Sequence, residues 1–196
     1  MKTVQNVSFD CMQESIDAYQ SSPARAIEKI MDDYGDGVKR LVYTYVKNEA
    51  DTDDVTQEVF LTIYQKLDSY KGESSFKSWL YAIAINESKD HLRSWKYRSE
   101  RLIEKLKETS HTWGAYHERE NPLNHILKQS ESEELFSELM NLSLKYREVL
   151  ILYYFKELST KEIAYALNLK EATIRTRLSR GREKLKSIVQ GGKTNG

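Results

Sequence analysis

The stretch STKEIAYALNLKEATIRTRLSRGREKLKSI, residues 159–188, predicts two helices joined by a tight turn. Ser159 and Glu162 have the spacing of a capping box, in which two side chains satisfy free backbone N–H groups at a helix start. The residues NLK, 168–170, are few enough for a three-residue turn, and the helical period returns from Glu171 onward. A short helix, a tight turn and a longer helix are typical of a helix-turn-helix.

The second of these helices has two unlike faces. Its buried stripe is expected to be Ile174, Leu178, Gly181, Leu185 and Ile188. Its outer face presents Ala172, Thr176, Ser179 and Arg180, with Arg175 beside them. Residues 174–184 also hold five positive charges. Small polar side chains flanked by arginines favour a surface that enters the major groove over a merely solvated basic face.

The charged residues of the chain are arranged in blocks, although the formal net charge is zero. Residues 161–196 carry nine bases against three acids, which gives a local net charge of +6. Residues 32–60 carry eight acids against three bases, a local net charge of −5. Blocks of opposite sign indicate two different partners, and the basic block is typical of a nucleic-acid partner.

Two helices are expected in the acidic part. Apolar residues spaced at three and four define one face of a long helix: Ile27, Ile30, Met31, Tyr34, Val38, Leu41, Val42 and Tyr45. Gly35 and Gly37 allow a bend within it. The next helix, DDVTQEVFLTIYQKL at 53–67, buries an apolar residue every four positions, and its polar side carries Asp54, Gln57, Glu58 and Leu61. Leu61 is either an incidental exposed leucine or an anchor for a basic partner helix.

A third helix is expected to start near Phe76, after the loop DSYKGESS at 68–75. Leu80, Ala84, His91 and Trp95 define the face expected to pack on the core. The opposite face presents Trp79, Asn86, Asp90, Arg93 and Tyr97. Aromatic rings beside arginine suit stacking on unpaired bases, but the spacing fits equally well with Trp79 and Tyr97 packing against neighbouring helices.

These patterns predict an all-α protein of two small helical domains joined by a linker. We expect an N-terminal tail at 1–23, a first domain at 24–100, a linker at 101–131, a second domain with the helix-turn-helix at 132–190, and a C-terminal tail at 191–196. The linker prediction rests on the loss of helical period and on the Gly and Asn-Pro residues within it.

Composition narrows the function classes. The single cysteine, Cys11, excludes an intramolecular disulfide and a multi-thiolate metal site, and a redox-sensor role for it has no second thiol in support. His117 lies near Glu118 and Glu120, but no His pair has the spacing of a zinc site on a helix, and no phosphate-binding loop or nucleophile motif is present. We therefore expect no metal, no cofactor and no enzymatic activity. The absence of a signal peptide and of a long apolar run predicts a cytoplasmic protein without stable membrane insertion.

The chain resembles bacterial RNA polymerase sigma factors of the extracytoplasmic-function (ECF) group. The N-terminal match runs from about Ala26 to Arg98 and includes DTDDVTQEVF, which resembles the region 2 helix that docks on the β′ clamp of core RNA polymerase. FKSWLYAIAINESKDHLR resembles the helix that captures and melts the −10 element. The C-terminal match, from Leu144 to Lys186, resembles region 4, which reads the −35 element and contacts the β flap.

The resemblance implies three sets of site residues. Polymerase binding falls on Asp54, Gln57, Glu58 and Leu61. Contacts to the −10 element fall on Ser74, Ser75 and Phe76 in the loop GESSF, which resembles the loop that holds a flipped base, and on Trp79, Asn86, Asp90 and Arg93. Contacts to the −35 element fall on Arg175, Thr176, Ser179 and Arg180. The net charge of −4 over 104–138 resembles the acidic segment that is threaded through the polymerase cleft.

The implied function is that of a factor that binds core RNA polymerase, directs it to promoter DNA and promotes melting, with an anti-sigma factor as a further expected partner. The chain departs from the family pattern at Leu144, where Pro is usual, at Asn168, where Gly is usual, and at Lys170, where Ser or Pro is frequent. None of these departures removes a base-contacting group. The alternative is an ordinary helix-turn-helix regulator, which needs neither the acidic helix nor the aromatic one.

Overall fold

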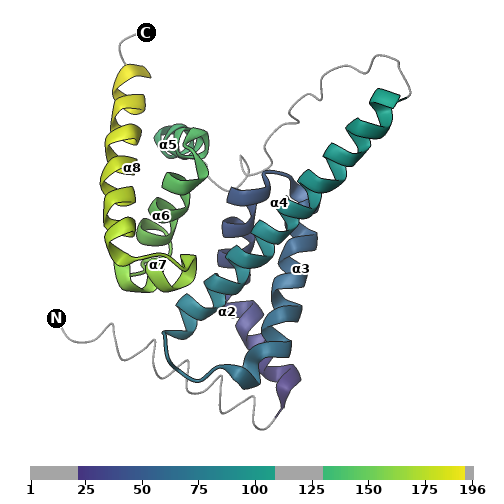
Figure 1. The fold of residues 1–196 in the computed structure, drawn as a ribbon. Helices are drawn as coiled ribbons and strands as arrows, with labels where there is room; N and C mark the ends of the chain where they lie inside the picture. Colours follow the sequence, from purple (N-terminus) through teal and green to yellow (C-terminus); the bar gives the residue numbers. More distant parts are fainter. Residues whose placement is uncertain (1–21, 109–129, 193–196) are drawn as a thin grey trace, which may run out of the picture.

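The computed structural model describes residues 22–108 and 130–192, and every regular element within these ranges is helical. The N-terminal half consists of α2 (Pro23–Val46), α3 (Glu49–Lys66), the short 3-10 helix η1 (Leu67–Ser69) and α4 (Phe76–Glu108). The C-terminal half consists of α5 (Ser130–Asn141), α6 (Leu144–Tyr154), α7 (Thr160–Leu167) and α8 (Glu171–Gly192). The all-α prediction is confirmed (Figure 1).

Local sequence explains where the N-terminal helices begin and end. Pro23 occupies the first turn of α2, where its missing N–H costs nothing, and Lys47 ends that helix in the left-handed conformation. Asn48 then caps α3 by accepting a hydrogen bond from the backbone N–H of Asp51 at 3.0 Å. The bend allowed at Gly35 and Gly37 does not interrupt α2, which is one continuous helix.

Two apolar residues expected in the core are not there. Met31 is 48% exposed and Trp95 is 57% exposed. Met31 follows the fully buried Ile30, and the 100° step between adjacent helical residues turns its side chain away from the core at this position. Trp95 lies beyond the last contact of α4 with the core, whose buried part ends at Ser88. Met31 and Trp95 are exposed because no neighbouring helix covers them, and the hydrophobic period of one helix does not show where its neighbours end.

The helix-turn-helix in the C-terminal half is confirmed. Ser159 accepts from the backbone N–H of Glu162, and the Glu162 carboxylate accepts from the backbone N–H of Ser159 at 2.9 Å, so the capping box is complete. The three-residue turn starts at Asn168, whose φ of 52° is left-handed, and the Leu169 N–H donates to Ala164 at 2.9 Å. Asparagine tolerates this backbone better than most residues, so the absence of the usual glycine costs little.

The two halves share one continuous core instead of standing apart. Buried residues of α2, α3 and α4 belong to the same cluster as those of α6, α7 and α8. α7 lies against the start of α4, and α6 contacts α2, while α8 forms the outer side of the C-terminal half (Figure 1). α4 continues as a helix to Glu108, beyond the expected start of the linker at 101, and α5 begins at Ser130, just before its expected end.

Candidate nucleic-acid and partner-binding surfaces

The outer face of α8 is exposed, as the helical period predicts. Ile174 and Leu178 are fully or nearly fully buried, and Thr176, Ser179 and Arg180 point to solvent on the other side. The Arg175 side chain is 70% exposed and is held along the helix by an ion pair with Glu171 at 2.8 Å. The Thr176 hydroxyl donates to the Ala172 carbonyl at 2.9 Å, which keeps the strip narrow. The structure therefore brings the four expected −35 residues onto one accessible surface.

The remaining arginines of α8 have structural contacts that periodicity did not reveal. Arg177 donates to Glu148 of α6 at 2.9 Å. The Arg182 guanidinium lies 5.4 Å from the ring centroid of Tyr153 and 5.5 Å from that of Tyr154, within the range of cation–π attraction. Lys184 also lies over the ring of Tyr146 in α6. Three of the five basic residues at 174–184 thus contact α6, so the charge density of this stretch has a packing origin as well as a surface one.

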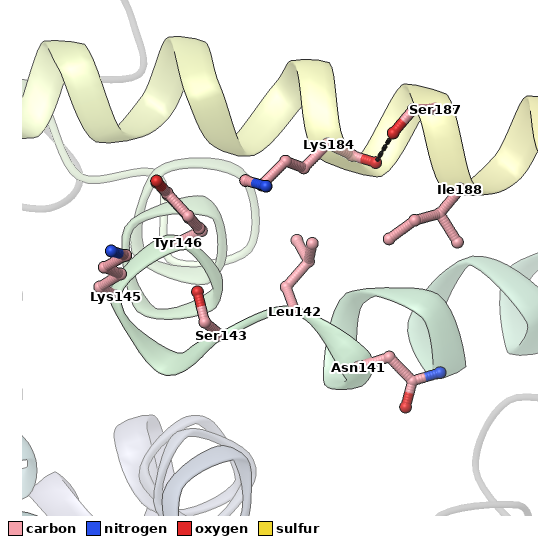
Figure 2. Close-up of a pocket in the computed structure, with 8 residues that line it drawn as sticks. All are labelled: Asn141, Leu142, Ser143, Lys145, Tyr146, Lys184, Ser187 and Ile188. Atoms are coloured by element: carbon pink, nitrogen blue, oxygen red, sulfur yellow. Dashed lines mark hydrogen bonds between the residues drawn. The ribbon is translucent and has the colours of Figure 1, made fainter.

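A groove of about 500 Å³ runs between α5, α6 and α8 (Figure 2). Leu142 and Ile188 give it an apolar floor. Lys145 and Lys184 lie on either side of Tyr146, with ammonium-to-centroid distances of 5.1 and 5.8 Å. The groove therefore offers an apolar surface beside two cations, and sequence analysis did not anticipate it, because its walls come from three helices.

The loop before α4 rests on an aromatic cluster. Phe76 contacts Tyr34, Tyr70 and Trp79, with ring centroids 5.8, 5.5 and 5.5 Å away, and Tyr70 lies 5.2 Å from Trp79. Phe76 is only 3% exposed, so in this structure its side chain is a core group that supports the loop. Trp79 is partly buried in the same cluster, which supports the packing interpretation of this residue.

Farther along α4, three of the expected −10 residues stay on the surface. Asn86, Asp90 and Arg93 are all exposed, and the Arg93 guanidinium forms an ion pair with Asp90 one turn earlier. Ser74 and Ser75 in the loop are half-buried. The candidate −10 surface therefore has two parts, an exposed polar row on α4 and a more enclosed loop at its N-terminus. Tyr97 lies in the part of α4 whose side chains are not described.

The candidate docking face on α3 is also exposed. Asp54, Gln57 and Glu58 point to solvent, and Leu61 is 50% exposed beside them. The opposite side of the helix buries Val55, Val59, Phe60 and Ile63. Tyr64 is 44% exposed one turn after Leu61 and enlarges the apolar part of this face. An apolar centre within an acidic rim is suited to a basic partner surface.

The loop and the C-terminal half also meet directly. The Ser75 hydroxyl donates to the carboxylate of Glu162 in α7. Burial opposes ionisation of Glu162, but hydrogen bonds from Ser75 and Ser159 outweigh it, so the pKa of this carboxyl lies below its ordinary value. At neutral pH Glu162 is therefore an anion held at the candidate base-holding loop.

Other site classes find no support in the described part of the chain. Residues 22–108 and 130–192 contain no cluster of His, Cys, Asp and Glu that could hold a metal ion. Within the same ranges, none of the helices has the length and apolar character needed to cross a membrane. Cys11, His111, His117 and His125 lie outside the described residues.

Comparisons with known proteins agree with this geometry. Sigma-70 region 2 matches residues 30–97, and Sigma-70 region 4 matches residues 132–185. The ECF RNA polymerase sigma-E factor of Escherichia coli K12 is 32% identical over 180 residues, which cover 91% of this chain and 94% of that protein. The ECF sigma factor SigW of Bacillus subtilis is 31% identical over 167 residues, 84% of this chain and 89% of that protein.

Solved structures show the same fold. CnrH, in complex with the cytosolic domain of CnrY, has a TM-score of 0.65 at 21% identity and covers 93% of this chain and 99% of its own. The sigma factor RpoE of Bartonella quintana, in complex with the anti-sigma factor NepR, has a TM-score of 0.62 at 20% identity, with coverage of 83% and 96%. The match of both regions, in order and over nearly the whole length of the relatives, shows that this chain belongs to the ECF sigma factors of RNA polymerase, which act in transcription initiation.

Proposed function

We propose that this sigma factor directs core RNA polymerase to promoters by reading a −35 element with α8 and a −10 element with α4 and its preceding loop. The observation that carries the proposal is the division of α8 into a buried stripe and an exposed strip inside a capped helix-turn-helix. A helix held in this way can enter the major groove, where arginine recognises guanine and small hydroxyl residues allow a close approach.

The α3 face is the proposed contact to the β′ clamp. Leu61 supplies the apolar anchor, Asp54, Gln57 and Glu58 surround it, and Tyr64 extends it. Charged rims set the orientation and the rate of association, while the buried apolar centre supplies most of the affinity. This arrangement favours the anchor interpretation of Leu61 over that of an incidental exposed leucine.

Promoter melting is proposed to use the exposed row of Asn86, Asp90 and Arg93 together with the loop hydroxyls of Ser74 and Ser75. Bases that leave the duplex lose pairing and stacking, and they regain stacking and hydrogen bonds on the protein. Opening then needs no nucleotide hydrolysis and no catalytic residue. Trp79 and Phe76 act behind this surface by keeping the loop in place.

Two protein partners complete the proposal. The groove between α5, α6 and α8 is the proposed contact to the β flap, because an apolar floor beside Lys145 and Lys184 suits a segment with apolar and acidic side chains. An anti-sigma factor is the second partner. Its support is that the structural relatives RpoE of B. quintana and CnrH were each solved in complex with another protein, in the case of RpoE the anti-sigma factor NepR.

The test is transcription in vitro from a template library with randomised upstream DNA. Core polymerase with this protein is expected to start RNA synthesis downstream of two shared motifs, one near −35 and one near −10, and core polymerase alone is not. If transcripts show no shared motif at either position, the proposal fails. Tight binding of promoter duplex by the protein without polymerase would instead favour the ordinary helix-turn-helix regulator.

A further inference from the structure

The strongest feature not used above is the contact between α7 and the loop before α4. Glu162 lies at the centre of this contact. Its carboxylate accepts from the Ser159 backbone and hydroxyl, at 2.9 and 2.7 Å, and also from the Ser75 hydroxyl of the N-terminal half. The carboxylate that caps α7 is thus also the acceptor for the Ser75 hydroxyl of the loop.

An aromatic ring of α7 stands beside this carboxylate. Tyr165 borders a hollow of about 240 Å³ whose other walls belong to the N-terminal half, including Tyr70, Ser74 and Trp79. The ring comes from α7 and the walls come from the proposed −10 loop, so the hollow exists only while the two halves are together. Tyr165 is 45% exposed, which leaves the hollow open on one side.

The chemistry that α7 presents to the loop is that of a nucleotide. Serine hydroxyls commonly donate to phosphate oxygens, and aromatic side chains commonly stack on unpaired bases. Glu162 offers the loop an anionic oxygen, and Tyr165 offers it a planar ring, one turn apart on the same helix. We propose, on the basis of the function proposed above, that α7 mimics the −10 strand and blocks the loop until the two halves separate.

A buried carboxylate holds the halves in this closed arrangement. Glu148 of α6 is 4% exposed, and it accepts from the Tyr45 hydroxyl of α2 at 3.0 Å and pairs with Lys89 of α4 at 3.5 Å. Its third partner, Arg177, belongs to its own half. Breaking a buried ion pair is costly unless water replaces the lost partners, so the closed form persists until the interface opens as a whole.

Closure leaves the other proposed surfaces accessible. Leu61 on α3 is 50% exposed, and the Arg175 side chain on α8 is 70% exposed. The closed protein can therefore still present its polymerase-docking and −35 surfaces, and only the −10 loop is occupied. A partner that binds the open form more tightly than the closed form shifts the equilibrium toward −10 capture.

The test uses the full chain and a fluorescein-labelled, mixed-sequence, single-stranded DNA 15-mer as the probe. Tyr45→Phe removes one hydrogen bond across the interface and touches none of the proposed DNA-binding residues. We expect it to tighten binding of the 15-mer roughly tenfold, as expected for a lost hydrogen bond to a charged group that had held the blocked form. The matched control, Tyr153→Phe, removes a hydroxyl from the C-terminal half and is expected to leave binding unchanged.

Tyr165→Ala tests the mimicry itself. This variant is expected to tighten binding of the 15-mer severalfold, because it removes the ring that borders the hollow. The control, Tyr154→Ala, removes another half-exposed ring from the same half and is expected to leave binding unchanged. Opening is measured separately as the distance between spin labels on Met31→Cys and Lys186→Cys in a Cys11→Ser background. We expect Tyr45→Phe to broaden this distance toward longer values.

Two results overturn the inference. One is that Tyr45→Phe lengthens the spin-label distance but binds the 15-mer no more tightly than the wild type does. The other is that neither Tyr45→Phe nor Tyr165→Ala differs from its control in either measurement. Promoter selection by the wild-type protein with core polymerase is measured separately. If only the α7 inference is wrong, the two promoter motifs are still found upstream of the start sites; if the proposed function is wrong, they are absent.

Discussion

Tyr45 donates a hydrogen bond to Glu148 at 3.0 Å, although 103 positions separate them in the chain and they belong to different sigma regions. Glu148 is also the partner of Arg177 on the −35 helix and of Lys89 on the −10 helix. One buried carboxylate therefore contacts both proposed DNA-binding helices, α4 and α8. Burial and the Glu148 carboxylate together raise the pKa of Tyr45 well above its ordinary value, so the hydroxyl remains a donor throughout the physiological range.

Polymerase docking is tested by the double variant Leu61→Ala with Glu58→Ala. Loss of the half-exposed leucine removes an apolar anchor worth ~1–2 kcal/mol of binding free energy, so affinity for core polymerase is expected to fall by roughly five- to thirtyfold. The measurement is a binding titration with labelled core enzyme. Met31→Ala, which removes a similarly exposed apolar side chain from α2, is the control and is expected to bind normally. Unchanged affinity of the double variant with a native circular dichroism spectrum would contradict the docking assignment.

Promoter melting is tested by Asn86→Ala with Arg93→Ala. Both residues are exposed on α4, and neither supports the core, so the free energy of unfolding is expected to stay within ~0.5 kcal/mol of the wild type. Transcription from duplex promoters is expected to fall more than transcription from templates with a pre-melted bubble, since the bubble supplies the opening that the variant lacks. An equal loss on both templates would argue against a role in melting.

Sequence reading at −35 is tested by Arg180→Ala. Its side chain shares the exposed strip with Thr176 and Ser179, so its loss is expected to cost ~1–3 kcal/mol and to relax preference at one base position. Arg182→Ala is the control: it loses the contact with Tyr153 and Tyr154, and about 0.5–1 kcal/mol of stability, but keeps the sequence preference.

Promoters randomised at −35 and transcribed at two salt concentrations separate the roles of Arg180. A loss that is uniform over all sequences, with the salt slope reduced by about one unit, would reassign this arginine to the phosphate backbone. Sequence reading would then rest on Arg175 and Thr176.

The two glycines of α2 provide a matched pair of stability variants. A Cβ at Gly35 meets no atom within 4 Å, so Gly35→Ala is expected to stabilise the protein by ~0.5–1 kcal/mol through helix propensity. A Cβ at Gly37 lies 2.8 Å from the Tyr81 hydroxyl and 3.4 Å from the Lys156 ammonium, so Gly37→Ala displaces contacts between the halves and loses that gain. Urea unfolding of both variants measures the difference in the free energy of unfolding. Equal stabilisation would show that the Tyr81 and Lys156 side chains move aside without loss of stability.

Lys156 makes the interface dependent on pH. Burial, followed by repulsion from Arg40 and Lys77, lowers its pKa to about 8 against the attraction of Asp36, and its ammonium lies 5.6 Å from the Tyr81 ring. A lowered lysine pKa means that the folded protein disfavours the protonated side chain. The resulting loss of folding stability is fully present below pH 8, and it disappears as the pH rises toward the ordinary pKa of 10.5. Burial also keeps the pKa of Tyr81 above its ordinary value, so this ring stays neutral across the window.

The free energy of unfolding should therefore rise between pH 8 and pH 10 in the wild type relative to Lys156→Met, by on the order of 1–3 kcal/mol. Urea titrations of both proteins across this range give the difference directly, because the other titrating groups are common to both. Parallel pH profiles would show that Lys156 keeps its charge when buried.

The sequence by itself determined the local structure. The helical periods of α2, α3 and α8, the capping box at Ser159 and the turn at Asn168 depend only on residues within a few positions of one another. The same reasoning correctly placed Leu61 on a polar face and Thr176, Ser179 and Arg180 on the outer side of α8. These predictions succeed because one helix already defines its own faces.

Only the tertiary structure decided what each face meets. The spacing of Trp79 fitted base stacking and helix packing equally well, and the structure places its ring and that of Phe76 against Tyr70. Arg177 turns to Glu148 because α8 packs against α6, and Glu162 reaches Ser75 because α7 lies against α4. The contacts of Arg177 and Glu162 join residues tens of positions apart. Their free energy depends on how two helices cross, and the hydrophobic period of a single helix carries no information on the crossing angle.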